Sequence, residues 1–61
     1  MRLKAGDTVR IHGGPFEGYE AIFDTRLDGQ ERVRVLLQFI NSQREVPVEL
    51  DVSQIRKQDK R

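Results

Sequence analysis

Residues 6–24 read GDTVRIHGGPFEGYEAIFD, and this stretch decides which fold the chain can adopt. Polar and apolar residues alternate across residues 8–12, which is the period of a half-buried strand. The Gly-Gly-Pro sequence at 13–15 follows, where the glycines tolerate positive φ and the proline presets the φ of a turn's second position. A second apolar run occupies residues 19–23. The stretch therefore predicts two strands that reverse at a tight turn, with Phe16 on or near that turn.

Three further strands are predicted downstream, at residues 32–40, at residues 44–49 and from Ile55 onward. Asp28-Gly29 precedes the first of them, and both residue types tolerate the left-handed conformation that a tight hairpin requires. Residues 51–54, DVSQ, are expected to close a single helical turn through side-chain hydrogen bonds from Asp or Ser. The predicted fold is all-β, a small five-stranded SH3-like barrel with one short helical turn before the last strand.

The predicted core consists of apolar residues that share the inward face of these strands. They are Val9, Ile11, Ala21, Phe23, Val33, Val35, Leu37, Val46, Val48, Leu50, Val52 and Ile55. Pro47 interrupts the fourth strand and cannot donate a ladder hydrogen bond, so it is placed at a sheet edge or a bulge.

Size and composition exclude several classes of protein. The chain has 61 residues, which is one small domain without room for a large active-site cleft. It has no cysteine and a single histidine, so no disulfide, metal site or cofactor is expected, and a cytoplasmic location fits this usage. Its formal charge of +1 predicts weak attraction to polyanions. No apolar run approaches the length of a membrane span. We assign residues 1–5 to a leader, 6–57 to the domain and 58–61 to a polar tail.

The carboxylates and the histidine do not suggest catalysis. Asp7, Asp24, Asp28 and Asp51 all lie at predicted strand ends, where capping of a turn explains them. His12 has no evident acid or base partner in the sequence. The chain is therefore predicted not to be an enzyme.

Two surfaces are candidates for binding. A basic one, with Phe16 or Tyr19 as a stacking platform for single-stranded nucleic acid, would consist of Arg10, His12, Arg32 and Arg34. Acidic neighbours dilute it, so an ordinary solvated face explains the same residues. An apolar surface formed by Phe16, which the turn displays, Phe39 and Ile40 is the other candidate. Ile40 points away from the face that holds Phe39, so at least one large apolar group should lie near solvent, either docking a protein or capping an end of the barrel.

Two motifs carry a family resemblance. Residues 6–11, GDTVRI, are followed by Gly-Pro-Phe at 14–16, and residues 47–55 read PVELDVSQI. In this order they resemble the C-terminal KOW domain of NusG-type bacterial transcription elongation factors. The middle, residues 18–24, is similar instead to the specialised RfaH-type members, and Ala21 stands where most KOW motifs carry glycine.

The resemblance implies a partner-binding role in transcription elongation and antitermination. In this family an N-terminal domain, outside this sequence, grips RNA polymerase, while the KOW barrel binds the ribosomal protein NusE or the termination factor Rho. The resemblance places the docking surface on Phe16, Phe39, Ile40, Asn41 and Arg44. A monomer is expected. The alternative is an RNA-binding KOW domain of the ribosomal-protein type, which the near-zero charge disfavours.

Overall fold

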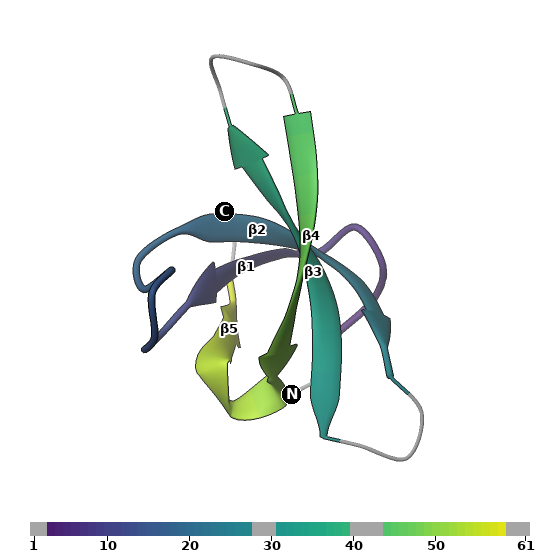
Figure 1. Cartoon of the computed structure of the whole chain (residues 1–61). Coiled ribbons are helices and arrows are strands. Elements are labelled where there is room, and N and C mark those ends of the chain that lie inside the picture. The colour runs from purple at the N-terminus through teal and green to yellow at the C-terminus, as the bar shows by residue number, and fades with distance from the viewer. Residues whose placement is uncertain (1–2, 28–30, 40–43, 59–61) are drawn as a thin grey trace.

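A computed structural model describes residues 3–27, 31–39 and 44–58 and shows five strands in one antiparallel sheet (Figure 1). The elements are β1 (Thr8–Ile11), β2 (Glu20–Arg26), β3 (Arg32–Phe39), β4 (Arg44–Asp51), the 3-10 turn η1 (Val52–Gln54) and β5 (Ile55–Lys57). The predicted all-β fold with a short helical turn before the last strand is confirmed. Within the described ranges no helix is long and apolar enough to cross a membrane.

The strand order in the sheet is β4-β3-β2-β1-β5, so β1 pairs with both β2 and β5. This order places the last strand beside the first and curls the sheet into a small SH3-like barrel. β4 lies at one edge, which confirms the edge position predicted for Pro47. The turn predicted at Asp28-Gly29 lies outside the described residues.

Strand β2 is longer than predicted. The apolar run ends at Phe23, but pairing with β3 continues through Thr25 and Arg26 after a register shift between Phe23 and Thr25. Leu27 then donates its backbone N–H to the Arg32 carbonyl over 3.0 Å. Thr25 and Arg26 extend the strand because β3 supplies partners for their backbone hydrogen-bonding groups. The alternation of residues in β2 alone does not reveal this pairing.

All five strands contribute to one hydrophobic core. Its buried members are Val9, Ile11, Ala21, Phe23, Val33, Val35, Leu37, Leu50 and Ile55. Val48 and Val52, also predicted to be core residues, are only half-buried and pack against this cluster. These buried side chains supply the apolar area that holds a domain of this size together.

The prediction that Val46 belongs to the core is wrong, because this side chain is 40% exposed. Val46 does face inward, since it pairs in register with buried Leu37. However, β4 is an edge strand, and β1 and β5 are only 4 and 3 residues long. The N-terminal end of β4 therefore extends beyond β1 and β5, and Val46 remains accessible to solvent there.

The turn η1 is held by a capping box. The Asp51 carboxylate accepts from the Ser53 N–H at 3.0 Å, and the Gln54 side-chain oxygen accepts from the Asp51 N–H at 3.2 Å. This confirms the helical turn predicted for residues 51–54 and identifies Asp51 as its cap. The Gln54 carbonyl in turn accepts from the His12 N–H at 2.6 Å, which joins η1 to the start of the β1–β2 loop.

Candidate protein-docking surface

The β1–β2 loop, residues 12–19, is shaped by two successive turns. Glu17 donates its N–H to the Gly14 carbonyl at 3.3 Å, and Tyr19 donates to the Phe16 carbonyl at 3.0 Å. Pro15 is well suited to the first turn because its φ is already set. The two turns place Phe16 in the middle of the loop, as the sequence predicts.

The loop rejoins the sheet through a bulge at Gly18. The Gly18 N–H donates to the Ile11 carbonyl at 2.7 Å, while the Ile11 N–H donates to the Tyr19 carbonyl at 2.9 Å. Gly18 and Tyr19 thus oppose the single residue Ile11 of β1, with Gly18 at a φ of 88°. The left-handed conformation favours glycine here, and the bulge aims Tyr19 towards the same face as Ile11 and Ala21.

Phe16 and Tyr19 form an edge-to-face aromatic pair. Their ring centroids are 5.9 Å apart and the rings are inclined by 78°. Phe16 is half-buried and packs against the core, whereas Tyr19 is 47% exposed. Phe16 thereby anchors the loop to the barrel, and Tyr19 presents an aromatic surface to solvent.

Phe39 and Val46 extend this apolar surface onto the β3–β4 hairpin. Ala21 pairs with Leu37, and Leu37 pairs with Val46, so these residues share the inward face. Tyr19 lies two residues before Ala21, and Phe39 two residues after Leu37, which puts both on that face beyond the Ala21–Leu37 pair. Phe39 is 39% exposed, which confirms that a large apolar group lies near solvent.

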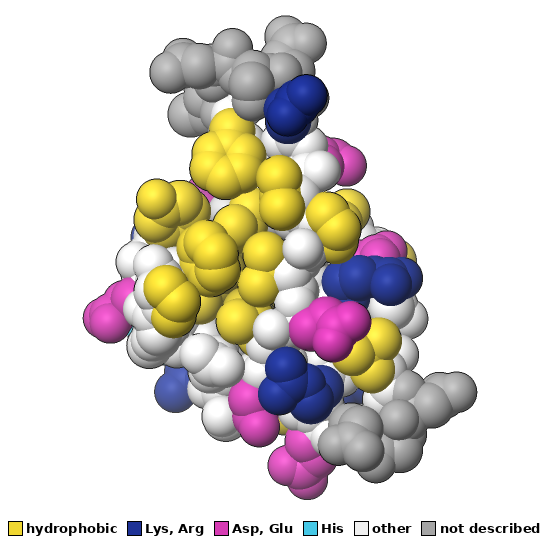
Figure 2. All heavy atoms as spheres, viewed as in Figure 1, with side chains coloured by type: hydrophobic (Ala, Val, Ile, Leu, Met, Phe, Trp, Pro, Cys, Tyr) yellow, Lys and Arg dark blue, Asp and Glu magenta, His cyan; other side chains and the backbone are white. Residues whose placement is uncertain are grey.

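We call these four residues, Phe16, Tyr19, Phe39 and Val46, the apolar rim. Figure 2 shows hydrophobic side chains gathered in one patch on this face of the molecule. Charged side chains lie mainly around the patch (Figure 2). An exposed aromatic patch with a charged margin is typical of a protein-docking surface.

The structure places three of the five docking residues expected from the resemblance. Phe16 and Phe39 belong to the apolar rim, and exposed Arg44 lies opposite Phe39 in the β3–β4 register. Ile40 and Asn41 lie outside the described residues. These two remain expectations.

Two members of the rim, Tyr19 and Val46, were not among the expected docking residues. The sequence predicts for Tyr19 only a role as a stacking platform for nucleic acid, and for Val46 only a place in the core. Pro47 was the one sequence signal for Val46, since an edge strand leaves its inward side chains covered from one side only.

Two of the four candidate basic residues pair with carboxylates of β2. Arg10 pairs with Glu20 at 3.1 Å, and Arg34 pairs with Asp24 at 2.8 Å. Asp24 thus lies inside β2 and binds a cation, instead of capping a turn at a strand end as predicted. His12 and Arg32 are exposed. Because the carboxylates of β2 lie between β1 and β3, the four basic residues form no continuous cationic face.

Two aspartates cap turns, as predicted for them. Asp7 accepts from the Lys4 N–H at 2.9 Å, and this hydrogen bond, aided by Lys57, lowers the pKa of Asp7. The hydrogen bond from Ser53 lowers the pKa of Asp51 in the same way. Both shifts favour the ionised carboxylate, whereas a general acid needs a raised pKa. Among the described residues, no cluster of three acidic, histidine or cysteine side chains could hold a metal ion.

Comparison with known proteins supports the family resemblance. No protein-family model matches the chain. The chain is 44% identical over 55 residues to the transcription termination/antitermination protein NusG of Deinococcus radiodurans. The match covers 90% of this chain and 28% of that protein, so the chain spans little more than a quarter of its relative's length. By its sequence and its five-stranded fold, the chain is related to NusG and is consistent with a C-terminal KOW-type domain of that family.

Proposed function

We propose that this chain is the protein-binding KOW module of a NusG-type transcription elongation and antitermination factor. The observation that carries the proposal is the apolar rim, which displays Tyr19, Phe39 and Val46 at 47%, 39% and 40% exposure on one face. Such a surface is suited to a partner's apolar groups, because removing it from water is favourable and its aromatic members can act as binding hot spots. The module performs no chemistry of its own.

The partner that best fits the relationship is the ribosomal protein NusE, with the termination factor Rho as a second partner of the same surface. Binding would tether either protein to transcribing RNA polymerase, which a separate domain of the factor would contact. The docking surface comprises the apolar rim with Arg44 at its margin, and Ile40 and Asn41 are expected to extend it. This activity belongs in the cytoplasm.

A titration of the isotope-labelled chain with purified NusE tests the proposal. We expect the largest amide shift changes at Phe16, Tyr19, Phe39 and Val46. Phe39→Ala should weaken binding about tenfold, because truncating an aromatic hot spot removes roughly 1–2 kcal/mol. Leu36→Ala is the matched control, since Leu36 lies on the same strand but faces the opposite side of the sheet. Shift changes confined to the face of Ile22 and Leu36 would contradict the proposal.

A parallel titration with single-stranded RNA tests the alternative of nucleic-acid binding. Because Arg10 and Arg34 are paired with carboxylates, we expect weak binding. Micromolar affinity that falls steeply with added salt would instead support an RNA-binding KOW domain.

A further inference from the structure

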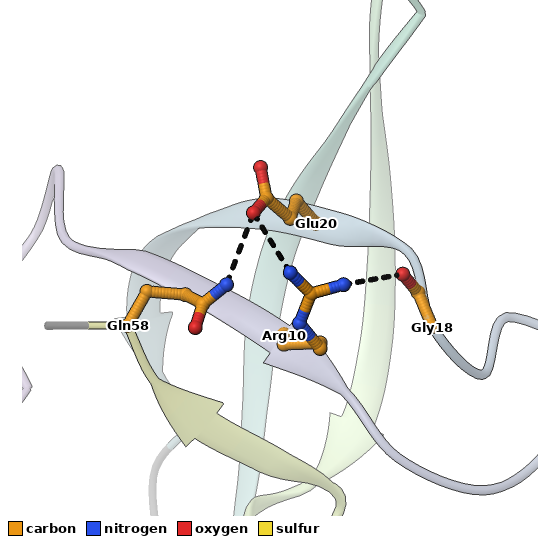
Figure 3. A network of polar contacts seen from close by, with 4 residues as sticks. All are labelled: Arg10, Gly18, Glu20 and Gln58. Carbon is orange, nitrogen blue, oxygen red and sulfur yellow. Dashed lines mark hydrogen bonds and ion pairs between the residues drawn. The ribbon is translucent and has the colours of Figure 1, made fainter. Parts of the chain in front are cut away.

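A small network of polar contacts holds the β1–β2 loop on the side that faces away from the apolar rim. Arg10 of β1 donates from Nη1 to the Gly18 carbonyl at 3.0 Å and from Nη2 to the Glu20 carboxylate at 3.1 Å. Gln58 donates to the same Glu20 oxygen at 3.0 Å. Figure 3 shows the Arg10 guanidinium lying between Gly18 and Glu20, with Gln58 reaching Glu20 from beyond β5.

Arg10 makes its contact at the point where the regular ladder stops. The β1–β2 pairing ends at Arg10 and Glu20, and the bulge puts the Gly18 carbonyl outside the paired strands. A guanidinium presents several N–H groups in a fixed plane, so it can bind the carbonyl and the carboxylate together. Arg10 therefore connects the bulge to the last paired residue of β2.

Gln54 holds the opposite end of the loop. Its carbonyl accepts from the His12 N–H at 2.6 Å, and its side-chain nitrogen donates to the Gly13 carbonyl at 3.4 Å. A Cβ at Gly14 would come within 3.2 Å of the same nitrogen, so η1 packs closely against the loop. The loop is thus fastened at Gly13 by η1 and at Gly18 by β1, with Phe16 between the two points.

We propose that Arg10 and Gln54 are positioning residues for the docking surface, holding the β1–β2 loop in the conformation that presents Phe16 and Tyr19. This inference rests on the proposed function, because it concerns how the apolar rim is prepared for its partner. When a binding surface is formed only part of the time, its apparent affinity falls in proportion to the formed fraction. A fastened loop avoids that loss and leaves less conformational entropy to remove on binding.

The effect should be local, which separates it from ordinary stabilisation. Side-chain exposures of 42% for Arg10 and 56% for Glu20 leave their ion pair well solvated. Exposed pairs of this kind add little to global stability. Loss of Arg10 should therefore loosen the loop while the core remains folded.

Arg10→Met tests the inference, because it keeps the apolar stem and removes every donor. The readout is amide hydrogen exchange in the free chain at Gly18 and Tyr19, whose N–H groups are bonded to Ile11 and Phe16. We expect exchange there to rise roughly threefold to fivefold, with Val33 and Val35 unchanged. NusE affinity should fall by the ratio of the formed fraction of the loop in the variant to that in the parent, which the exchange rates give. Arg10→Lys should give an intermediate effect, because a single ammonium group does not reproduce the planar set of N–H donors of the guanidinium.

Arg34→Met is the matched control. Arg34 has the same 42% side-chain exposure and also pairs across strands, but its partner is Asp24 of β2 and not a residue of the loop. It should change neither the exchange of Gly18 and Tyr19 nor NusE affinity.

Three outcomes overturn the inference. In Arg10→Met, loop exchange could stay at the parent rate, or it could rise equally in the core. The third is a fall in the formed fraction of the loop that NusE affinity does not follow, although Phe39→Ala does weaken binding. Unchanged affinity in Phe39→Ala itself would overturn the proposed function instead, and the exchange rates would still decide whether Arg10 holds the loop.

Discussion

At the scale of single residues, Gly18 determines how the loop returns to the sheet. Its φ of 88° lies in the left-handed region, and a Cβ there would meet nothing within 4 Å. Gly18→Ala should therefore lower the free energy of unfolding by about 1–2 kcal/mol through backbone strain alone. Urea denaturation would measure the change. Gly18→Asn should lose less, because asparagine tolerates this conformation better than alanine. An alanine variant as stable as the parent would contradict the bulge.

Asp51 makes stability depend on pH. Its hydrogen bond from the Ser53 N–H lowers its pKa in the folded chain below the ordinary value of 3.8. A group whose pKa is lowered on folding stabilises the native state above the unfolded value, and that stabilisation disappears as the pH falls through the folded value. The contribution of Asp51 should therefore be complete near neutrality and lost progressively below pH 3.8.

The Asp51→Asn variant tests this contribution. The asparagine oxygen can still accept from the Ser53 N–H but carries no charge. The free energy of unfolding of the variant should therefore fall less on acidification than that of the parent. Urea midpoints measured at neutral pH and in acid would show the difference. Some acid sensitivity should remain in the variant, because the pKa of Asp7 is lowered as well. Identical acid profiles for the two proteins would rule out the cap as a source of the pH dependence.

At the scale of secondary-structure elements, β4 shows how one alternating strand can serve both the core and the surface. Its inward residues change from exposed Val46 through half-buried Val48 to buried Leu50. All three face buried residues of β3 across the ladder. The gradient arises because β4 is an edge strand, and only its C-terminal end packs against the rest of the barrel.

This gradient predicts unequal costs for the same substitution. Val35→Ala, at a fully buried site on β3, should lower the free energy of unfolding by about 2 kcal/mol, because it leaves a cavity. Val46→Ala should cost less than about 1 kcal/mol, because solvent already reaches the side chain. It should nevertheless weaken NusE binding. Denaturation and titration of both variants would check this, and equal losses of stability would place Val46 in the core after all.

At the scale of the whole molecule, closure of the barrel depends on the short pairing of β1 with β5. Ile11 and Ile55 are opposite one another in that pairing, and both are fully buried. Replacing Ile55 with alanine should cost about 2–5 kcal/mol. Since a domain of this size has only a few kcal/mol of net stability, we expect Ile55→Ala to be largely unfolded at 37 °C.

Far-UV circular dichroism and one-dimensional proton spectra would report this loss of structure. Ile22→Ala is the control, because Ile22 is half-buried on the outer face and its truncation should leave the barrel folded. A folded Ile55→Ala variant of near-parent stability would show that β5 is dispensable for closure.

The sequence alone was sufficient for the all-β class, for the five strands and for most of the core. Alternation with a period of two is a local property, and it correctly assigned Val9, Val35 and Leu37 to the inward face. The helical turn at residues 51–54 could also be predicted from the sequence, because a capping box involves only neighbouring residues.

Tertiary structure decided what covers each inward face and what holds each loop. Val46 has the same alternation as Val35, but its place at the start of an edge strand leaves it exposed. Likewise, the Gln54 side chain donates to the Gly13 carbonyl across 41 positions of sequence, and no local pattern reveals this contact. Alternation tells which way a side chain points, whereas its burial depends on residues distant in the chain that fold against it.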